Sequence, residues 1–196
     1  AAIAVADIRK MEGLTTADAV AMTMYKPLEV GESRIRFKMF RKEKPIHLST
    51  VLPMLENMGV KVIDERPHEI KPLNGGSIWI HDLGLMHDAS LSLEADDMRE
   101  LFQQSFAQVW HNRVENDGFN KLVLYAQLPW RGVLVLRACC KYIRQTGFPF
   151  SQTYMEQALA NHPQIAALLA DLFYARFDPT VQDKSPQRCE ALIDAI

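Results

Sequence analysis

The clearest pattern in the chain is an alternation of apolar and basic residues at positions 34–39. Apolar residues hold the odd positions and basic residues the even ones: Ile35, Phe37 and Met39 against Arg34, Arg36 and Lys38. This period of two predicts a strand with one buried face and one face in water. At positions 48–59 the apolar residues recur at helical spacing instead, with Ser49 or Thr50 as the N-cap and Gly59 at the end.

Two further strands and a second helix are expected after this helix. Positions 60–72 begin with valine and isoleucine and continue past Pro67, which indicates a strand near a sheet edge. The turn at positions 73–76 predicts a hairpin with a strand at positions 77–87. From Ser92 the apolar residues follow one helical stripe, and acidic residues crowd its first turn. The predicted order is therefore β-α-β-β-α.

The rest of the chain is predicted to be helical. The expected helices lie near 122–125, at 129–145, and after Ser151 and Pro163. Apolar residues wrap most of the circumference of the helix at 129–145, so we expect a buried central helix. The fold class expected is α+β. Its regions are an N-terminal helix and connector at 1–31, an α+β domain at 32–112 and a helical region at 113–196.

Composition and charge exclude several classes of protein. The formal net charge is -2, with 22 basic and 24 acidic residues, so no overall field would attract nucleic acid or an anionic membrane. No apolar run approaches the roughly 20 residues of a transmembrane helix, and no signal peptide begins the chain. The three cysteines show no CxxC spacing, which indicates a reducing compartment, and we expect the cytoplasm. We also expect both ends to be cut from a longer polypeptide.

The motifs of cofactor-dependent and hydrolytic enzymes are missing from the sequence. It contains no GxGxxG for a dinucleotide, no P-loop, no GxSxG elbow and no HExxH metal-binding helix. His81 and His87 lie on one predicted strand, each followed by aspartate, but about 3.3 Å per residue separates them by roughly 20 Å. This distance is too long for two ligands of one metal ion. We therefore expect no catalytic, cofactor-binding or metal-binding residues, and we assign both histidines structural roles.

The one dense cluster of charge in the sequence is basic. It comprises Arg34, Arg36, Lys38, Arg41, Lys42 and Lys44. Such a cluster can bind an anion or an acidic partner. The alternative is a solvated strand face that discourages edge-to-edge pairing, and we favour that interpretation. No aromatic residues are interleaved to stack on bases, which argues against single-stranded nucleic acid.

The segment PIHLSTVLPMLENMGVKVIDER, at positions 45–66, resembles an ACT domain, a ferredoxin-like module with the βαββα order predicted above. ACT modules bind amino acids or serve as pairing surfaces. The resemblance implies ligand-binding residues in the first strand-to-helix loop and near the end of the helix: Lys44, His47, Ser49 and Asn57. Ile46 stands where the family usually has a glycine after the loop proline, and its side chain hinders close approach of a ligand to the backbone.

A second resemblance covers nearly the whole chain. It is carried by AVADIRKMEGL, RFKMFR, VLPMLENMGVKVIDERPHEI, WIHDLGL, FAQVWHNRVENDGFNKLVL and ARFDP. In this order they are similar to the segment upstream of the catalytic domain in the large bacterial NAD-dependent glutamate dehydrogenases. The resemblance implies a parent enzyme that oxidises L-glutamate to 2-oxoglutarate and ammonia with NAD. That family's catalytic and cofactor-binding residues lie further along the chain, so this segment alone is expected to be inactive and to hold no cofactor.

Three functions remain open at this point. The first is a regulatory or assembly segment, whose partners are the catalytic domain of the same chain and further copies in a homo-oligomer. The second is an ACT-type sensor of an amino-acid effector. The third is an independent small enzyme that uses the histidine and acid pairs of the hairpin. We favour the first, because a well-patterned core carries no catalytic constellation, and we expect neither nucleic acid nor membrane as a partner.

Overall fold

The structure is a computed structural model that describes residues 2–16, 18–26, 34–73, 75–88, 96–180 and 186–196. The chain divides into two compact units. The sheet unit comprises Ala1–Glu56 and Val60–Arg99, and the helical unit comprises Asn57–Gly59 and Glu100–Ile196. Residues 27–31 of the region expected to hold the connector, and residues 92–95 of the helix expected from Ser92, fall outside the described residues.

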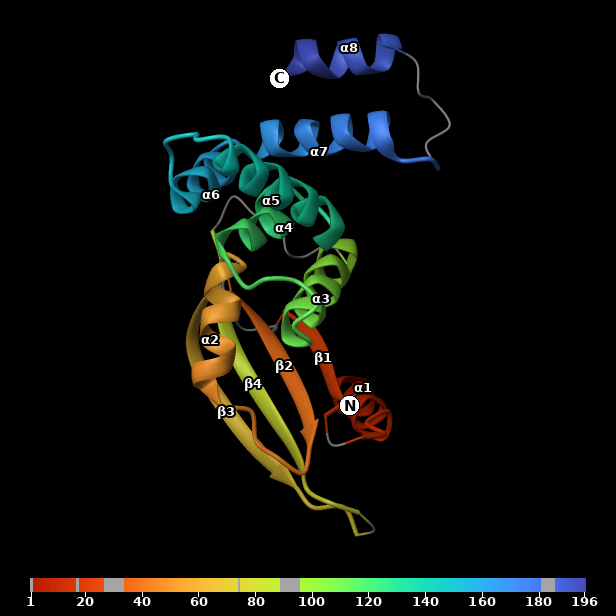
Figure 1. The fold of residues 1–196 in the computed structure, drawn as a ribbon. Coiled ribbons are helices and arrows are strands. Elements are labelled where there is room, and N and C mark those ends of the chain that lie inside the picture. Colours follow the sequence, from red (N-terminus) through yellow and green to blue (C-terminus); the bar gives the residue numbers. More distant parts are fainter. Residues whose placement is uncertain (1, 17, 27–33, 74, 89–95, 181–185) are drawn as a thin grey trace. The chain divides into compact units, whose positions relative to one another are not determined.

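The sheet unit is built on four antiparallel strands in the order β1-β2-β4-β3 (Figure 1). They are β1 (Val20–Tyr25), β2 (Arg34–Lys42), β3 (Lys61–Ile70) and β4 (Ile78–Met86), with α2 (Leu48–Asn57) between β2 and β3. The α+β class is confirmed, and so are the three strands predicted from alternation and turns. β1 is not among the predicted strands, because its sequence VAMTMY is apolar at both odd and even positions.

β1 completes the sheet from the N-terminal side of the module. It pairs with one edge of β2, so that Met22 lies opposite Met39 and Met24 opposite Phe37. A ferredoxin-like βαββαβ module takes its fourth strand from the C-terminal end instead. The chain therefore reaches a four-stranded sheet by using a strand that precedes the βαββα segment.

One face of the sheet forms the main core of this unit. Its most buried residues are Phe37, Met39, Leu83 and Leu85. His81 shares this face, opposite Met39, and its ring bonds to the backbone just before α2. α2 therefore covers this face, and it buries Val51 and Leu55 at the helical spacing that the sequence predicts.

The opposite face carries Arg36 and Lys38, and the expectation of a solvated basic face is wrong for both. Arg36 is only 8% exposed, and Lys38 forms an ion pair with Asp7 of α1 (Ala2–Glu12). β2 is an interior strand, paired with β1 on one side and β4 on the other. Its charges therefore do not serve to prevent edge-to-edge pairing between sheets. Part of this face is covered by α1 and by an apolar cluster around Leu14.

The helical unit contains the helices that follow the sheet (Figure 1). They are α3 (Asp96–Trp110), whose first turn belongs to the sheet unit, η1 (Gly118–Lys121), α4 (Leu122–Tyr125), α5 (Trp130–Gln145), α6 (Gln152–Asn161), α7 (Pro163–Phe177) and α8 (Pro186–Ala195). The helices predicted in this region are confirmed. In the described ranges, no helix combines the length and the apolar character that a membrane span requires.

The expectation that α5 would be a buried central helix, with apolar residues around most of its circumference, is wrong. Val133 and Leu136 are buried, but Leu134 and Ile143 are 42% and 40% exposed. α5 therefore has a buried side and an exposed side. Its buried side also carries a charged residue, Arg137, which needs partners inside the unit.

Candidate functional site

The structure places three of the four predicted ligand-binding residues at one end of α2 and the fourth at the other. Lys44, His47 and Ser49 are exposed in the loop before α2 and in its first turn. Asn57 is the last residue of α2, roughly 12 Å from Ser49 at about 1.5 Å per residue. Its side chain donates a hydrogen bond to Asn116 Oδ1, at 3.1 Å. The loop residues and Asn57 therefore do not form one site.

The loop before α2 already has a hydrogen-bond partner from the sheet. The backbone N–H of Ile46 donates to His81 Nε2, at 3.0 Å. A ring nitrogen that accepts carries no proton, so the proton of the neutral imidazole lies on Nδ1, which donates to Glu65 Oε1 at 2.6 Å. The side chain of His81 is 6% exposed. The Ile46 amide, which could otherwise donate a hydrogen bond to a ligand in this loop, thus already donates to a buried side chain of the protein.

A buried polar network fixes the other face of the sheet. Arg36 donates through Nε to Asp82 Oδ1 at 2.8 Å, through a second nitrogen to Asp64 Oδ1 at 2.6 Å and through the third to the Asp82 carbonyl at 2.7 Å. Tyr25 donates its hydroxyl proton to the other carboxylate oxygen of Asp82, at 2.9 Å. The network joins β1, β2, β3 and β4 through side chains as well as through the backbone.

Protonation in this network follows from burial and from the two carboxylates. Burial disfavours the charged guanidinium of Arg36, but hydrogen bonds to Asp82 and Asp64 outweigh it and raise the pKa of Arg36. Burial, and then the hydrogen bond to the Asp82 carboxylate, raise the pKa of Tyr25 to about 12. Both groups are therefore held in the forms that hydrogen-bond to aspartate, which is a structural role.

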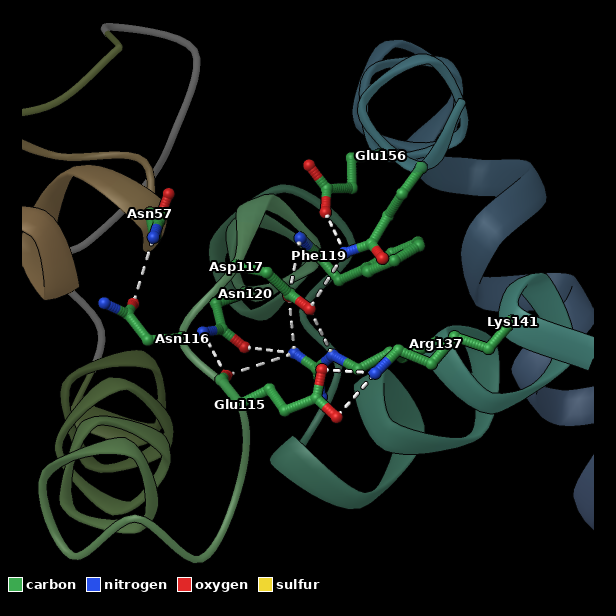
Figure 2. Close-up of polar contacts among 10 residues, drawn as sticks. Asn57, Glu115, Asn116, Asp117, Phe119, Asn120, Arg137, Lys141 and Glu156 are labelled. Carbon is green, nitrogen blue, oxygen red and sulfur yellow. Dashed lines mark hydrogen bonds and ion pairs between the residues drawn. The ribbon is translucent and has the colours of Figure 1, made fainter. Parts of the chain in front are cut away.

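The helical unit contains a second buried network, centred on Arg137 (Figure 2). Arg137 is 2% exposed and donates to both carboxylate oxygens of Asp117, each at 2.8 Å. It also donates to Asn120 Oδ1 at 2.7 Å, and its guanidinium lies 5.8 Å from the centre of the Phe119 ring. Bidentate, charge-assisted hydrogen bonds of this kind are stronger than those between neutral groups.

The partners of Arg137 come from the short segment before α4. Asp117 caps η1 by accepting from the Phe119 N–H at 3.2 Å, and the Asn120 side chain donates to the Glu115 carbonyl at 3.0 Å. One turn after Arg137 on α5, Lys141 bonds to the Glu115 carboxylate. The hydrogen bond lowers the pKa of Glu115. α5 thus holds the segment 115–120 at two successive turns.

Neither Arg137 nor Asp117 was singled out by the sequence analysis as a site residue. The available signal is that Arg137 interrupts the apolar run VLVLRACC, because a charge on a buried helix face requires a partner. The carboxylate oxygens of Asp117 accept from Phe119, Arg137 and Gln152, at distances of 2.8 to 3.4 Å. Because they are occupied in this way, the cluster organises the fold and is not arranged to act on a substrate.

Metal ligation and cysteine chemistry receive no support from the geometry. Within the described residues, no group of three or more His, Cys, Asp or Glu side chains could hold a metal ion. The three cysteines are free thiols. Burial raises the pKa of Cys140, which makes it a poorer nucleophile than an ordinary thiol.

Comparison with known proteins places both units in one family. Residues 19–98 match the family model described as glutamate dehydrogenase, ACT3 domain, and residues 114–179 match glutamate dehydrogenase, helical motif 3. The NAD-specific glutamate dehydrogenase of Halomonas elongata is 38% identical over 97% of the chain, and that of Pseudomonas aeruginosa is 34% identical over 98%. The enzyme of Mycobacterium tuberculosis is 36% identical over 94%.

These matches confirm the resemblance found in the sequence motifs. The chain spans 12% of the length of each of these relatives, so it corresponds to a small part of a large enzyme. The ACT3 match begins at residue 19, one residue before β1, which places β1 within the module. The chain belongs to the NAD-specific glutamate dehydrogenase family, in which it carries the ACT3 domain and helical motif 3.

Proposed function

We propose that this chain is a non-catalytic assembly and regulatory segment of a cytoplasmic NAD-dependent glutamate dehydrogenase. The parent enzyme converts L-glutamate, NAD and water to 2-oxoglutarate, ammonia and NADH. The chain's partners are the catalytic domain of the same polypeptide and further copies of the enzyme. The identity of its relatives and the structural character of both buried networks support this proposal.

The turn between β2 and α2 does not fit NAD. A dinucleotide site places the pyrophosphate at a glycine-rich turn between a strand and a helix. The turn between β2 and α2, at positions 43–47, contains no glycine, and Ile46 donates its amide to His81. We therefore assign hydride transfer and NAD binding to other parts of the parent enzyme.

The observation that carries the assembly role is an exposed apolar surface on α1. Ile3, Val5 and Ile8 are 52%, 50% and 48% exposed. Of these, Ile8 also lines a cavity of about 340 Å³, together with Met11, Ile70 and Ile78. Exposed apolar surface of this kind marks sites of protein association. We assign the α1 surface, defined as Ile8 and the cavity that it lines, to contact with a second copy.

Amino-acid sensing at the ACT loop is the weaker proposal. A ligand carboxylate at that loop would have to displace His81 from the Ile46 amide and leave the buried His81 Nε2 without its donor. A buried donor or acceptor without a partner costs about 1–3 kcal/mol. The hydrogen bond from Ile46 to His81 therefore weighs against ligand binding at Lys44, His47 and Ser49.

Sedimentation velocity tests the α1 surface. The purified chain is expected to show a mass that rises with concentration, and Ile8→Glu is expected to return it to a monomer, because a carboxylate at the contact must be desolvated. Tyr142→Glu is the matched control, since Tyr142 is 68% exposed on α5 and lies outside this surface. A chain that remains monomeric at every concentration, or an Ile8→Glu variant that associates like the wild type, would contradict the proposal.

A further inference from the structure

We propose that a polar pocket in the helical unit, between η1 and α6, binds a small zwitterion of the α-amino-acid class. The pocket has a volume of about 340 Å³, at the lower end of the range of roughly 300–1,000 Å³ for small-molecule sites. Its polar lining includes Asn57, Lys121, Glu156, Gln157 and Asn161, together with the bare backbone of Gly118. This site is separate from the ACT loop and from the α1 surface.

The two charged residues of the pocket have opposite signs. They are Lys121 and Glu156. Among the described residues neither of them takes part in an ion pair. Glu156 accepts one hydrogen bond through Oε1, from Gln152 at 2.8 Å, and Figure 2 shows it beside the segment that carries Asp117 and Phe119. The pocket thus offers an anionic group and a cationic group that the fold itself does not neutralise.

Gly118 makes room for the carboxylate of Glu156. A Cβ atom at position 118 would lie 2.5 Å from Glu156 Oε2 and 3.1 Å from its Cδ, so any side chain there would displace the carboxylate. The backbone of Gly118 does not adopt the left-handed conformation seen at Gly59 and Gly147, and no turn geometry demands a glycine. The glycine at this position therefore leaves the space that the Glu156 carboxylate occupies.

Opposite charges in one small pocket select the class of ligand. Glu156 would repel a simple anion, and Lys121 would repel a simple cation. An α-amino acid can place its ammonium group beside Glu156 and its carboxylate beside Lys121. Asn57 donates one of its two side-chain N–H groups to Asn116, and its side-chain carbonyl oxygen can accept from an ammonium group. The amides of Gln157 and Asn161 add neutral groups for a polar side chain.

Calorimetric titration of the 196-residue chain tests the site. The probes are a panel of L-α-amino acids, with glutarate as a ligand without an amine and butylamine as a ligand without a carboxylate. We expect at least one amino acid to bind, and Glu156→Gln, Lys121→Met and Gly118→Ala each to weaken its affinity by roughly tenfold to a hundredfold. Glu190→Gln on α8 is the matched control and should leave the affinity unchanged.

The outcomes separate the proposal from its alternatives. Binding of an amino acid that depends on Glu156, Lys121 and the bare Gly118 supports it, provided that circular dichroism shows each variant folded. The proposal is overturned if no amino acid of the panel shows detectable binding. It is also overturned if glutarate or butylamine binds as tightly as the amino acid. Unchanged affinity in folded Gly118→Ala overturns it as well. None of these results depends on association through the α1 surface.

Discussion

Replacing Arg137 with alanine should lower the free energy of unfolding of the helical unit by about 3–5 kcal/mol. The substitution removes the partner of a carboxylate that is only 14% exposed, and it leaves the Asn120 side chain without its donor. Asp117 would then keep its cap on η1 but lose both charged hydrogen bonds. Urea unfolding followed by circular dichroism measures the change, because helices dominate the signal of this unit.

Lys141→Ala is the matched control for this prediction. It removes the same charge one turn further along α5 and breaks the ion pair with Glu115, whose side chain is 58% exposed. Exposed ion pairs contribute at most about 1 kcal/mol, so this variant should remain close to the wild type. If both variants lost equal stability, or if Arg137→Ala lost less than about 1 kcal/mol, Arg137 would not hold the segment 115–120 as described.

Gly59→Ala should also destabilise the chain strongly, by about 2–4 kcal/mol. Gly59 ends α2 with a φ of 87°, and the Val60 N–H closes the helix by donating to the Leu55 carbonyl at 3.2 Å. An added Cβ would also lie 2.9 Å from Cε2 of Tyr125. The expected loss therefore has two parts, the left-handed backbone and the clash with the ring, and thermal unfolding measures their sum.

Gly147→Ala isolates the first of these two parts. Gly147 has a nearly equal φ of 85°, but a Cβ there would meet no atom within 4 Å. Its cost should be the backbone contribution alone, about 1–2 kcal/mol. Equal losses in the two variants would mean that the close approach of Tyr125 to Gly59 contributes nothing.

The elements that could be predicted from the sequence are those with a strong local pattern. β2 alternates in polarity, and α2 has apolar residues at helical spacing with Gly59 after its last turn, so both elements follow from local rules. The predicted N-cap is wrong, because α2 begins at Leu48 and therefore contains Ser49 and Thr50 in its first turn. β1 lacks alternation because Met22 and Met24 are buried while the intervening positions are half-buried. Only its pairing with β2 distinguishes this segment from a linker.

The buried networks could not be predicted in the same way, because their partners are distant in the sequence. Arg36 and Asp82 are 46 residues apart, and Arg137 and Asp117 are 20 residues apart. The basic pattern of β2 is equally consistent with solvated and with buried charges. The choice depends on Asp82 of β4 and on Asp7 of α1, which the folded sheet unit brings beside it.

The resemblance to an ACT domain predicted the sheet unit but not the state of its loop. Lys44 and His47 lie in the loop before α2 and Ser49 lies in its first turn, whereas Asn57 bonds to Asn116 in the helical unit. The hydrogen bond from Ile46 to His81 depends on the register in which β4 pairs with β2. This register cannot be predicted from the local sequence pattern.

The central proposal, that this chain is a non-catalytic segment of a glutamate dehydrogenase, is tested most directly by its turnover. The purified chain is mixed with L-glutamate and NAD, and NADH is followed by its absorbance, with a complete NAD-specific glutamate dehydrogenase as the positive control. We predict that NADH forms no faster than in a protein-free blank. NADH formation whose rate rises in proportion to the concentration of the chain would contradict the proposal.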